Sequence, residues 1–174
     1  MEKLLVVIDY QNDFISPDGA LYVNGSEKLE NRIVREINAF KKNKNDIVFL
    51  KDTHDQNYLS TEEGKHLPFP HTLKGTNGHE LYGKVLLKSK GYPIFEKDAF
   101  GSRELAHLLE KKQYKEITLV GVMTNYCVLF NCVIAKTFNP NARCRVIKKA
   151  VGSGNKKTDK AVFKLLEELH FELI

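Results

Sequence analysis

The chain has no tryptophan, and only three of its 174 residues are cysteines. Cys127, Cys132 and Cys144 are odd in number and lack paired spacing, so they do not fit the disulfide framework of a small secreted protein. The chain also lacks a secretory apolar segment at its start and any apolar run near the roughly 20 residues that cross a bilayer. We therefore expect a soluble, cytoplasmic protein with no membrane partner.

Positive charge is present but is not concentrated. The net charge of +5 comes from scattered lysines, such as the pairs Lys41–Lys42 and Lys111–Lys112, with no aromatic residues interleaved. A nucleic-acid surface needs one basic patch, so we expect these lysines to be solvated and no nucleic acid to bind. With 42% hydrophobic and 28% charged residues and no internal repeat, the composition predicts one ordinary domain over residues 1–174.

Apolar runs of strand length alternate with segments of helical periodicity. We expect strands at 4–8, 47–51, 93–96, 117–121, 144–148 and 170–174, and helices at 27–43, 102–112, 124–138 and 157–168. Apolar stripes such as Ile33, Ile37 and Phe40 are typical of helices that cover a parallel sheet. The helix at 124–138 is apolar nearly all round and is expected to be buried. The alternation predicts an α/β fold.

Three predicted strands are followed by side chains that can carry out chemistry. Asp9, Lys97 and Cys127 each lie just beyond a strand, and Cys127 is on the first turn of a helix that Thr124 is expected to cap. Side chains at the carboxyl ends of parallel strands face one crevice, so a base, a cation and a nucleophile would meet there. The helix dipole would favour the thiolate. Each residue alone also has an ordinary interpretation: turn-forming acid, solvated lysine and core cysteine.

The 40-residue stretch 52–91 is too long for an idle connection, because loops of this size in compact domains are usually functional. Asp52 and His54 stand two apart at a strand end, so their side chains project from one face, as two ligands of one metal must. Further candidate ligands in this stretch are Glu63 and His71, and His66 and His79 compete for the ligand role. Asp, Glu and His suit Zn²⁺, Mn²⁺ or Fe²⁺, and the residues alone leave open which histidine completes the set.

Five segments carry a family pattern in order along most of the chain. They are Val7–Phe14, Asp52–Asp55, Pro70–Gly78, Glu96–Phe100 and Gly121–Cys127. Together they resemble the isochorismatase-like cysteine hydrolases, and within them the nicotinamidase branch. The resemblance implies a three-layer αβα fold with a mostly parallel, six-stranded, doubly wound sheet. One departure is Asn125, where the family commonly has Asp, and this removes a charge close to the thiol.

The resemblance implies a catalytic triad of Asp9, Lys97 and Cys127. It also implies an oxyanion hole formed by the backbone N–H groups of Met123 and Cys127, exposed by a cis peptide bond between Val122 and Met123. The expected chemistry is amide hydrolysis through a thioester on Cys127.

Nicotinamidases bind one divalent ion through an Asp-x-His pair and a later His, and some add a Glu. This pattern falls on Asp52, His54, Glu63 and His71. Glu63 is preferred to Glu62 because its nine-residue interval from His54 resembles that of the Glu-using members. We expect Zn²⁺, with Mn²⁺ and Fe²⁺ as alternatives, and a role in orienting a ring nitrogen of the substrate.

The activity that the resemblance implies is hydrolysis of nicotinamide, and of pyrazinamide, to the acid and ammonia in NAD salvage. Phe14 and Phe69 are candidate walls of a flat aromatic pocket, with core filling as the alternative for each, and Gln11 is a third substrate-binding candidate. The alternative enzyme is an isochorismatase-type or other small-amide hydrolase of the same fold, and the non-enzymatic alternative is a silent binding protein. The expected partner is a small-molecule carboxamide, and a homo-oligomer stays open.

Overall fold

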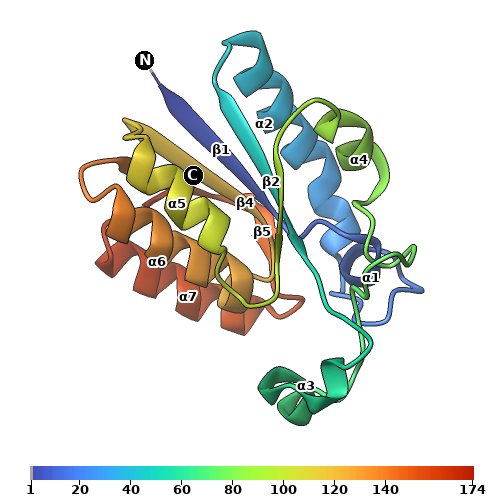
Figure 1. Ribbon diagram of the computed structural model, residues 1–174. Helices are drawn as coiled ribbons and strands as arrows, with labels where there is room; N and C mark the ends of the chain where they lie inside the picture. The colour runs from blue at the N-terminus through green and yellow to red at the C-terminus, as the bar shows by residue number, and fades with distance from the viewer. Residues whose placement is uncertain (1) are drawn as a thin grey trace.

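The computed structural model describes residues 2–174, which form one six-stranded sheet covered by helices (Figure 1). The strands are β1 (Lys3–Ile8), β2 (Asp46–Asp52), β3 (Ile94–Lys97), β4 (Glu116–Val122), β5 (Arg143–Gly152) and β6 (Glu172–Leu173). Their order is β3-β2-β1-β4-β5-β6, and every neighbouring pair is parallel. The expected doubly wound α/β fold is confirmed, and the sheet is parallel throughout.

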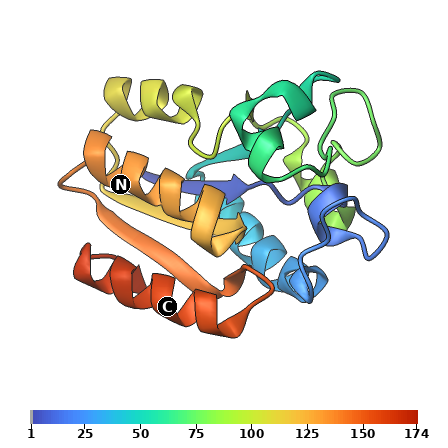
Figure 2. The same ribbon diagram turned by 90° about the horizontal axis from the view of Figure 1, so that it is seen from below.

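Helices form a layer on each face of the sheet (Figures 1 and 2). The helices of the structure, including α3 beyond the end of the sheet, are α1 (Asn12–Ile15), α2 (Glu30–Lys42), α3 (Glu62–His66), α4 (Gly83–Ser89), α5 (Arg103–Lys111), α6 (Leu129–Phe138) and α7 (Lys156–Glu168). Because side chains alternate along a strand, Leu4, Val6 and Ile8 of β1 pack in the same apolar cluster as residues of α5, α6 and α7. Leu5 and Val7 pack on the opposite face with residues of α2 and α4.

The two central strands, β1 and β4, lie at a switch in the winding of the sheet. The chain leaves β1 through α2 on one face and reaches β4 through α5 on the other, and β1 and β4 are hydrogen-bonded neighbours. In open α/β sheets, ligands bind at the carboxyl ends of the strands at such a point. The helical turn Tyr58–Ser60 and α3 project beyond this end of the sheet (Figure 1), so they form a rim around it.

The stretch 52–91 has more regular structure than a loop. It contains the turn at Tyr58–Ser60, α3 and α4, and Thr61 caps α3 by accepting a hydrogen bond from the Gly64 N–H at 3.0 Å. Helices this short span too few turns to give a clear apolar periodicity, so the sequence pattern did not indicate them.

The first turn of the helix expected at 124–138 is a π turn, Thr124–Val128. The N–H groups of Tyr126 and Val128 both donate to the carbonyl of Met123, each at 3.1 Å. Thr124 does not cap this turn, because Met123 is the cap residue and the buried Thr124 hydroxyl has no hydrogen-bond partner among the described residues. The predicted threonine cap is therefore wrong.

The expectation that this helix is buried all round is also wrong. α6 buries Asn131, Cys132 and Ala135, but Phe130 and Val133 are each 48% exposed. The sheet and α5 cover the inner side of α6, and the opposite side faces solvent. A mostly apolar helix does not by itself show how many of its sides have neighbours.

Across residues 2–174, each helix is too short or too polar to span a lipid bilayer. The three cysteines are unpaired.

Candidate active site

Four adjacent elements bring ionisable side chains to the carboxyl end of the sheet. Lys97 is the last residue of β3, Asp52 is the last residue of β2, and the two are register partners. Asp9 directly follows β1, in a left-handed backbone conformation with φ of 49°, and its N–H donates to Leu50 of β2 at 3.0 Å. Cys127 lies in the π turn that follows β4. The order of the strands thus places these residues side by side.

The Lys97 ammonium group joins the cluster. Its Nζ lies 2.7 Å from Oδ2 of Asp9, 3.0 Å from Oδ1 of Asp52 and 3.4 Å from Sγ of Cys127. All four side chains are buried. The structure therefore brings together the three residues expected as a triad and adds Asp52, which the sequence indicated only as a metal ligand.

Burial sets the proton affinities in this cluster. Removal from water raises the pKa of Asp9 to about 6, although Lys97 counteracts the rise. Burial likewise raises the pKa of the Cys127 thiol well above its usual range, and Lys97 offsets only part of that. Burial thus opposes the thiolate that the helix dipole is expected to favour, so formation of the thiolate calls for a base, and the carboxylate of Asp9 is the candidate.

Burial would lower the pKa of Lys97, but neighbouring negative charge, above all that of Asp9, raises it well above its usual range. For Asp52, burial opposes ionisation, yet Lys97 and the adjacent imidazoles hold its pKa well below its usual range. Lys97 therefore stays a cation and Asp52 an anion.

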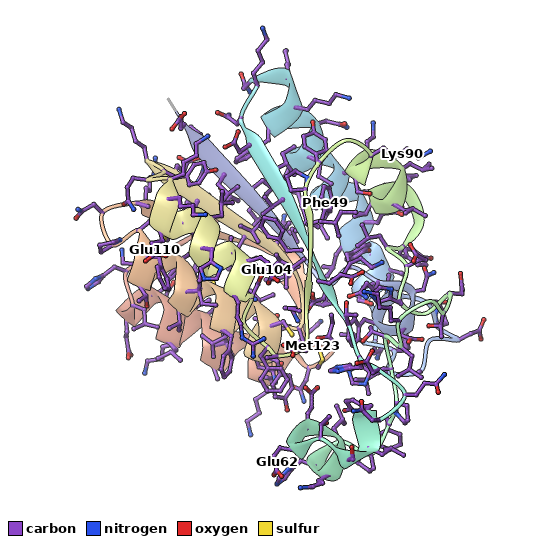
Figure 3. The ribbon with its side chains drawn as sticks, in the orientation of Figure 1. Phe49, Glu62, Lys90, Glu104, Glu110 and Met123 are labelled. Carbon is purple, nitrogen blue, oxygen red and sulfur yellow. The ribbon has the colours of Figure 1, made fainter. Side chains whose placement is uncertain are left out.

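The backbone before Cys127 has the expected unusual geometry. The peptide bond between Val122 and Met123 is cis. Met123 and Cys127 both line the cavity at this end of the sheet, and Figure 3 draws Met123 at the end of the sheet that faces α3. The oxyanion hole assigned to their N–H groups stays a prediction.

A second cluster shares Asp52 with the first. Asp52, His54 and His71 bring ligand atoms within 4.8 Å of one another. Oδ2 of Asp52 lies 3.0 Å from Nε2 of His54 and 3.4 Å from Nε2 of His71. Nδ1 of His71 lies 2.8 Å from the Phe69 carbonyl, which orients the ring with Nε2 toward the cluster. Nε2 of His54 is buried, and its contact with Asp52 lacks the geometry of a hydrogen bond, as do all its other contacts among the described residues. These donors therefore fit a divalent ion.

Glu63 lies at the edge of this cluster. Its Oε1 is 4.0 Å from Nε2 of His54 and 3.9 Å from Nε2 of His71. The neighbouring Glu62 side chain is 79% exposed, pairs with Lys65, and lies on α3 out beyond the sheet (Figure 3). Of the two glutamates, Glu63 is the one that faces the histidines.

The two competing histidines lie elsewhere. Nδ1 of His66 is 2.9 Å from the backbone carbonyl of Glu62, and the His66 side chain is exposed. Nε2 of His79 is 2.8 Å from the Thr53 hydroxyl. Neither belongs to the group formed by Asp52, His54 and His71.

Two residues of this cluster were not indicated by the sequence analysis. The Thr72 hydroxyl donates to Oδ2 of Asp52 at 3.0 Å. The ring of Tyr58 packs against both imidazoles, with centroids 4.6 Å from His54 and 5.0 Å from His71. Thr72 directly follows a predicted ligand, which was an available signal, whereas Tyr58 is placed by a short turn that the pattern did not predict.

Both clusters open into one cavity of about 1130 Å³. Phe14 lines it, as expected, and its ring lies 5.5 Å from that of His71. Phe69 is 56% exposed and is not among the lining residues, because its side chain points to solvent while its carbonyl contacts His71. The structure thus does not bring Phe69 to the pocket wall.

Gln11 is also absent from the lining of the cavity. It is fully buried, its Nε2 donates to the carbonyls of Asp52 at 2.8 Å and His79 at 2.9 Å, and its Oε1 accepts from the Asp52 N–H at 2.8 Å. The side-chain amide therefore extends the pairing of β1 with β2 by one step and holds the backbone of Asp52. These bonds leave Gln11 turned away from the space that a substrate would occupy.

Comparison with known proteins gives consistent matches over the whole described chain. The isochorismatase domain family matches residues 3–174. The isochorismatase family protein PncA of Bacillus subtilis is 34% identical over 173 residues, which cover 90% of each chain. The crystal structure of nicotinamidase/pyrazinamidase PncA from Bacillus subtilis has a TM-score of 0.88 at 28% identity and covers 99% of both chains. The pyrazinamidase of Pyrococcus horikoshii in complex with zinc has a TM-score of 0.86 at 26% identity and covers 100% of this chain and 99% of that one.

Proposed function

Because the chain belongs to the isochorismatase family and is an amidohydrolase acting on carboxamides, we propose that it hydrolyses nicotinamide, and also pyrazinamide, to the carboxylic acid and ammonia. The observation that carries the proposal is the contact of Lys97 Nζ with Asp9, Asp52 and Cys127 beside the cavity. Nicotinate made in this way would serve NAD salvage.

The proposed reaction is covalent. Asp9 accepts the Cys127 thiol proton as Sγ attacks the carboxamide carbon, and the N–H groups of Met123 and Cys127 stabilise the oxyanion. Asp9 then returns the proton to the amide nitrogen, the C–N bond breaks, and ammonia leaves a thioester on Cys127. Asp9 next takes a proton from water, the hydroxide attacks the thioester, and the C–S bond breaks. Asp9 returns its proton to the sulfur as the acid departs, which restores the thiol. Throughout the reaction, the Lys97 ammonium group holds the Asp9 carboxylate and the Cys127 sulfur in place.

We propose that Asp52, His54 and His71, with Glu63 at the edge, would hold one divalent ion, and that Zn²⁺ fits these donors, with Mn²⁺ and Fe²⁺ as alternatives. When bound, the ion would offer a Lewis-acid site for a ring nitrogen of the substrate. Phe14 would pack against the ring, since it lines the cavity beside His71.

Ammonia release from nicotinamide, pyrazinamide and benzamide tests this function. We expect turnover of the first two and a much lower rate for benzamide, which lacks the ring nitrogen. Cys127→Ala should abolish turnover in a folded protein, and mass spectrometry of the quenched wild-type reaction should find an acyl adduct on Cys127. Equal rates for benzamide and nicotinamide would make a general amidase the better reading. A Cys127→Ala variant that keeps more than a few per cent of the rate would exclude the thioester.

A further inference from the structure

A buried amide side chain ties the nucleophile turn to the segment that follows Lys97. Asn131 lies in α6, four residues after Cys127, and is fully buried. Its Nδ2 donates to the carbonyl of Cys127 at 2.7 Å and to that of Phe100 at 3.0 Å. Its Oδ1 accepts from the N–H of Ser102 at 3.0 Å. Both Nδ2 hydrogens are therefore used. The bonds join the loop that follows β3 to the π turn that follows β4.

The partner loop runs directly from Lys97 to the start of α5. Ser102 caps α5 by accepting from the Leu105 N–H at 3.1 Å, so its position is fixed from that side too. Gly101 lies close to α6, since a Cβ there would come 2.8 Å from the side chain of Ile134. Phe100 lines the cavity and packs against Tyr126 of the nucleophile turn, with centroids 5.2 Å apart.

We propose that Asn131 is a positioning residue, which sets the distance between the Cys127 sulfur and the Lys97 ammonium group by holding their two backbone segments together. The inference rests on the proposed role of Cys127. Phe100 and Ser102 follow Lys97 by only three and five residues, so a shift of this loop would be transmitted to the end of β3. The Lys97 ammonium group in turn lies 3.4 Å from the Cys127 sulfur. Misplacement of reacting groups by about 1 Å is enough to cost roughly a hundredfold in rate.

The chain supplies a matched control at the other end of the same helix. Asn139 is also fully buried, its Nδ2 donates to the carbonyls of Leu109 at 2.7 Å and Phe138 at 2.8 Å, and its Oδ1 accepts from the Tyr114 N–H at 2.7 Å. The two asparagines thus have the same bonding pattern and burial. Only Asn131 bonds to the nucleophile turn, so the pair separates positioning from general stability.

The experiment compares Asn131→Asp with Asn139→Asp, and Asn131→Thr with Asn139→Thr. At both sites aspartate keeps the shape but places carboxylate oxygens against backbone carbonyls. Threonine at 131 can keep the bond to the Cys127 carbonyl four residues back and loses the others, whereas threonine at 139 loses the bonds to Leu109 and Phe138. Folding is checked by urea unfolding. Steady-state kinetics with nicotinamide and the rate of iodoacetamide modification at Cys127, located by peptide mass spectrometry, are then measured.

We expect both Asn131 variants to lower kcat by about tenfold or more with a much smaller change in KM, and to slow modification of Cys127. The Asn139 variants should lose similar stability but keep kcat and the rate of Cys127 modification near their wild-type values. The assignment is wrong if Asn131 and Asn139 variants of equal stability have equal kcat and equal rates of Cys127 modification. It is also wrong if Cys127 is modified faster in the Asn131 variants than in the wild-type protein. The modification rate needs no substrate, so it tests Asn131 even if the wild-type protein does not hydrolyse nicotinamide.

Discussion

Lys97 is a buried cation that contacts three other members of its cluster within 3.4 Å. Its removal would leave Asp9 without its ion-pair partner, and removal of Asp9 would leave the sulfur without a base. Each residue is therefore useful only while the other is present, and catalytic groups that act as a unit are strongly non-additive.

We predict that Asp9→Asn and Lys97→Ala each lower kcat by roughly 10²- to 10⁴-fold, and that the double variant is little worse than the poorer single variant. The measurement is a double-mutant cycle on kcat with circular dichroism as the folding control. Losses that multiply in the double variant would mean that the two residues act independently, contrary to the proposed triad.

The pKa of Asp9, raised by burial to about 6, predicts an acid limb in the pH–rate profile. Asp9 must be ionised to accept the thiol proton, so kcat/KM should be full above this pKa and fall as pH drops through about 6. Protonation of His71 would also release a bound ion, so the metal content is counted at each pH. A flat profile between pH 5 and pH 8, at constant metal content, would contradict Asp9 as the base.

At the scale of elements, the connection between β2 and β3 supplies three of the four proposed metal ligands, each from a different segment. His54 lies just beyond β2, Glu63 lies in the short helix α3, and His71 lies in the irregular chain that follows. Glu62 and Glu63 are adjacent in α3 but face different surroundings, which provides an internal control.

We predict that His54→Ala and His71→Ala each weaken Zn²⁺ binding by about a hundredfold, that Glu63→Ala weakens it less, and that Glu62→Ala leaves it unchanged. An ion with bound waters replaces one carboxylate oxygen with water more readily than it replaces an imidazole nitrogen. Elemental analysis and competition with a chelator provide the affinities. An effect of Glu62→Ala equal to that of Glu63→Ala would show that the loss comes from disturbing α3.

The elements were predictable where the apolar signal is continuous. β1 and β4 were expected within one or two residues of their observed bounds, since both are runs of buried apolar residues. The π turn before α6 was not expected, because it depends on how residues 124–128 meet Met123 and not on their composition. The solvent-facing side of α6 was missed for a similar reason: hydrophobicity does not reveal which neighbours are present.

At the scale of the whole molecule, the sheet is the framework that fixes the cluster, so its core controls stability. We predict that Leu119→Ala, in the buried middle of β4, destabilises the protein by about 2–5 kcal/mol because it leaves a cavity between packed layers. Leu87→Ala is the control, since Leu87 is 63% exposed on α4, and it should change stability by less than about 0.5 kcal/mol. Urea unfolding measures both, and equal losses would contradict the described core.

The sequence was sufficient to expect a parallel α/β sheet and to place Asp9, Lys97 and Cys127 at strand ends. It was not sufficient for contacts that depend on register. Asp52 meets Lys97 only because the two are partners in the β2–β3 pairing, and Gln11 reaches the Asp52 backbone only because β1 lies beside β2. The strand order thus adds a contact with Lys97 to the expected role of Asp52, and it turns Gln11 away from the substrate space.

The pairing of β1 with β4 joins segments that are far apart in the chain, as in the contact of Lys3 with Glu116, 113 residues later. Asp9 follows β1 and Cys127 follows β4, so the two residues meet only once these strands have paired. Pairings of such long sequence separation form slowly, because the entropy of closing a long loop is lost before the new contacts stabilise it. During refolding, helix content would return early. Asp9 would reach the Cys127 sulfur later, when β1 pairs with β4. The recovery of enzyme turnover during refolding would therefore report the pairing of β1 with β4.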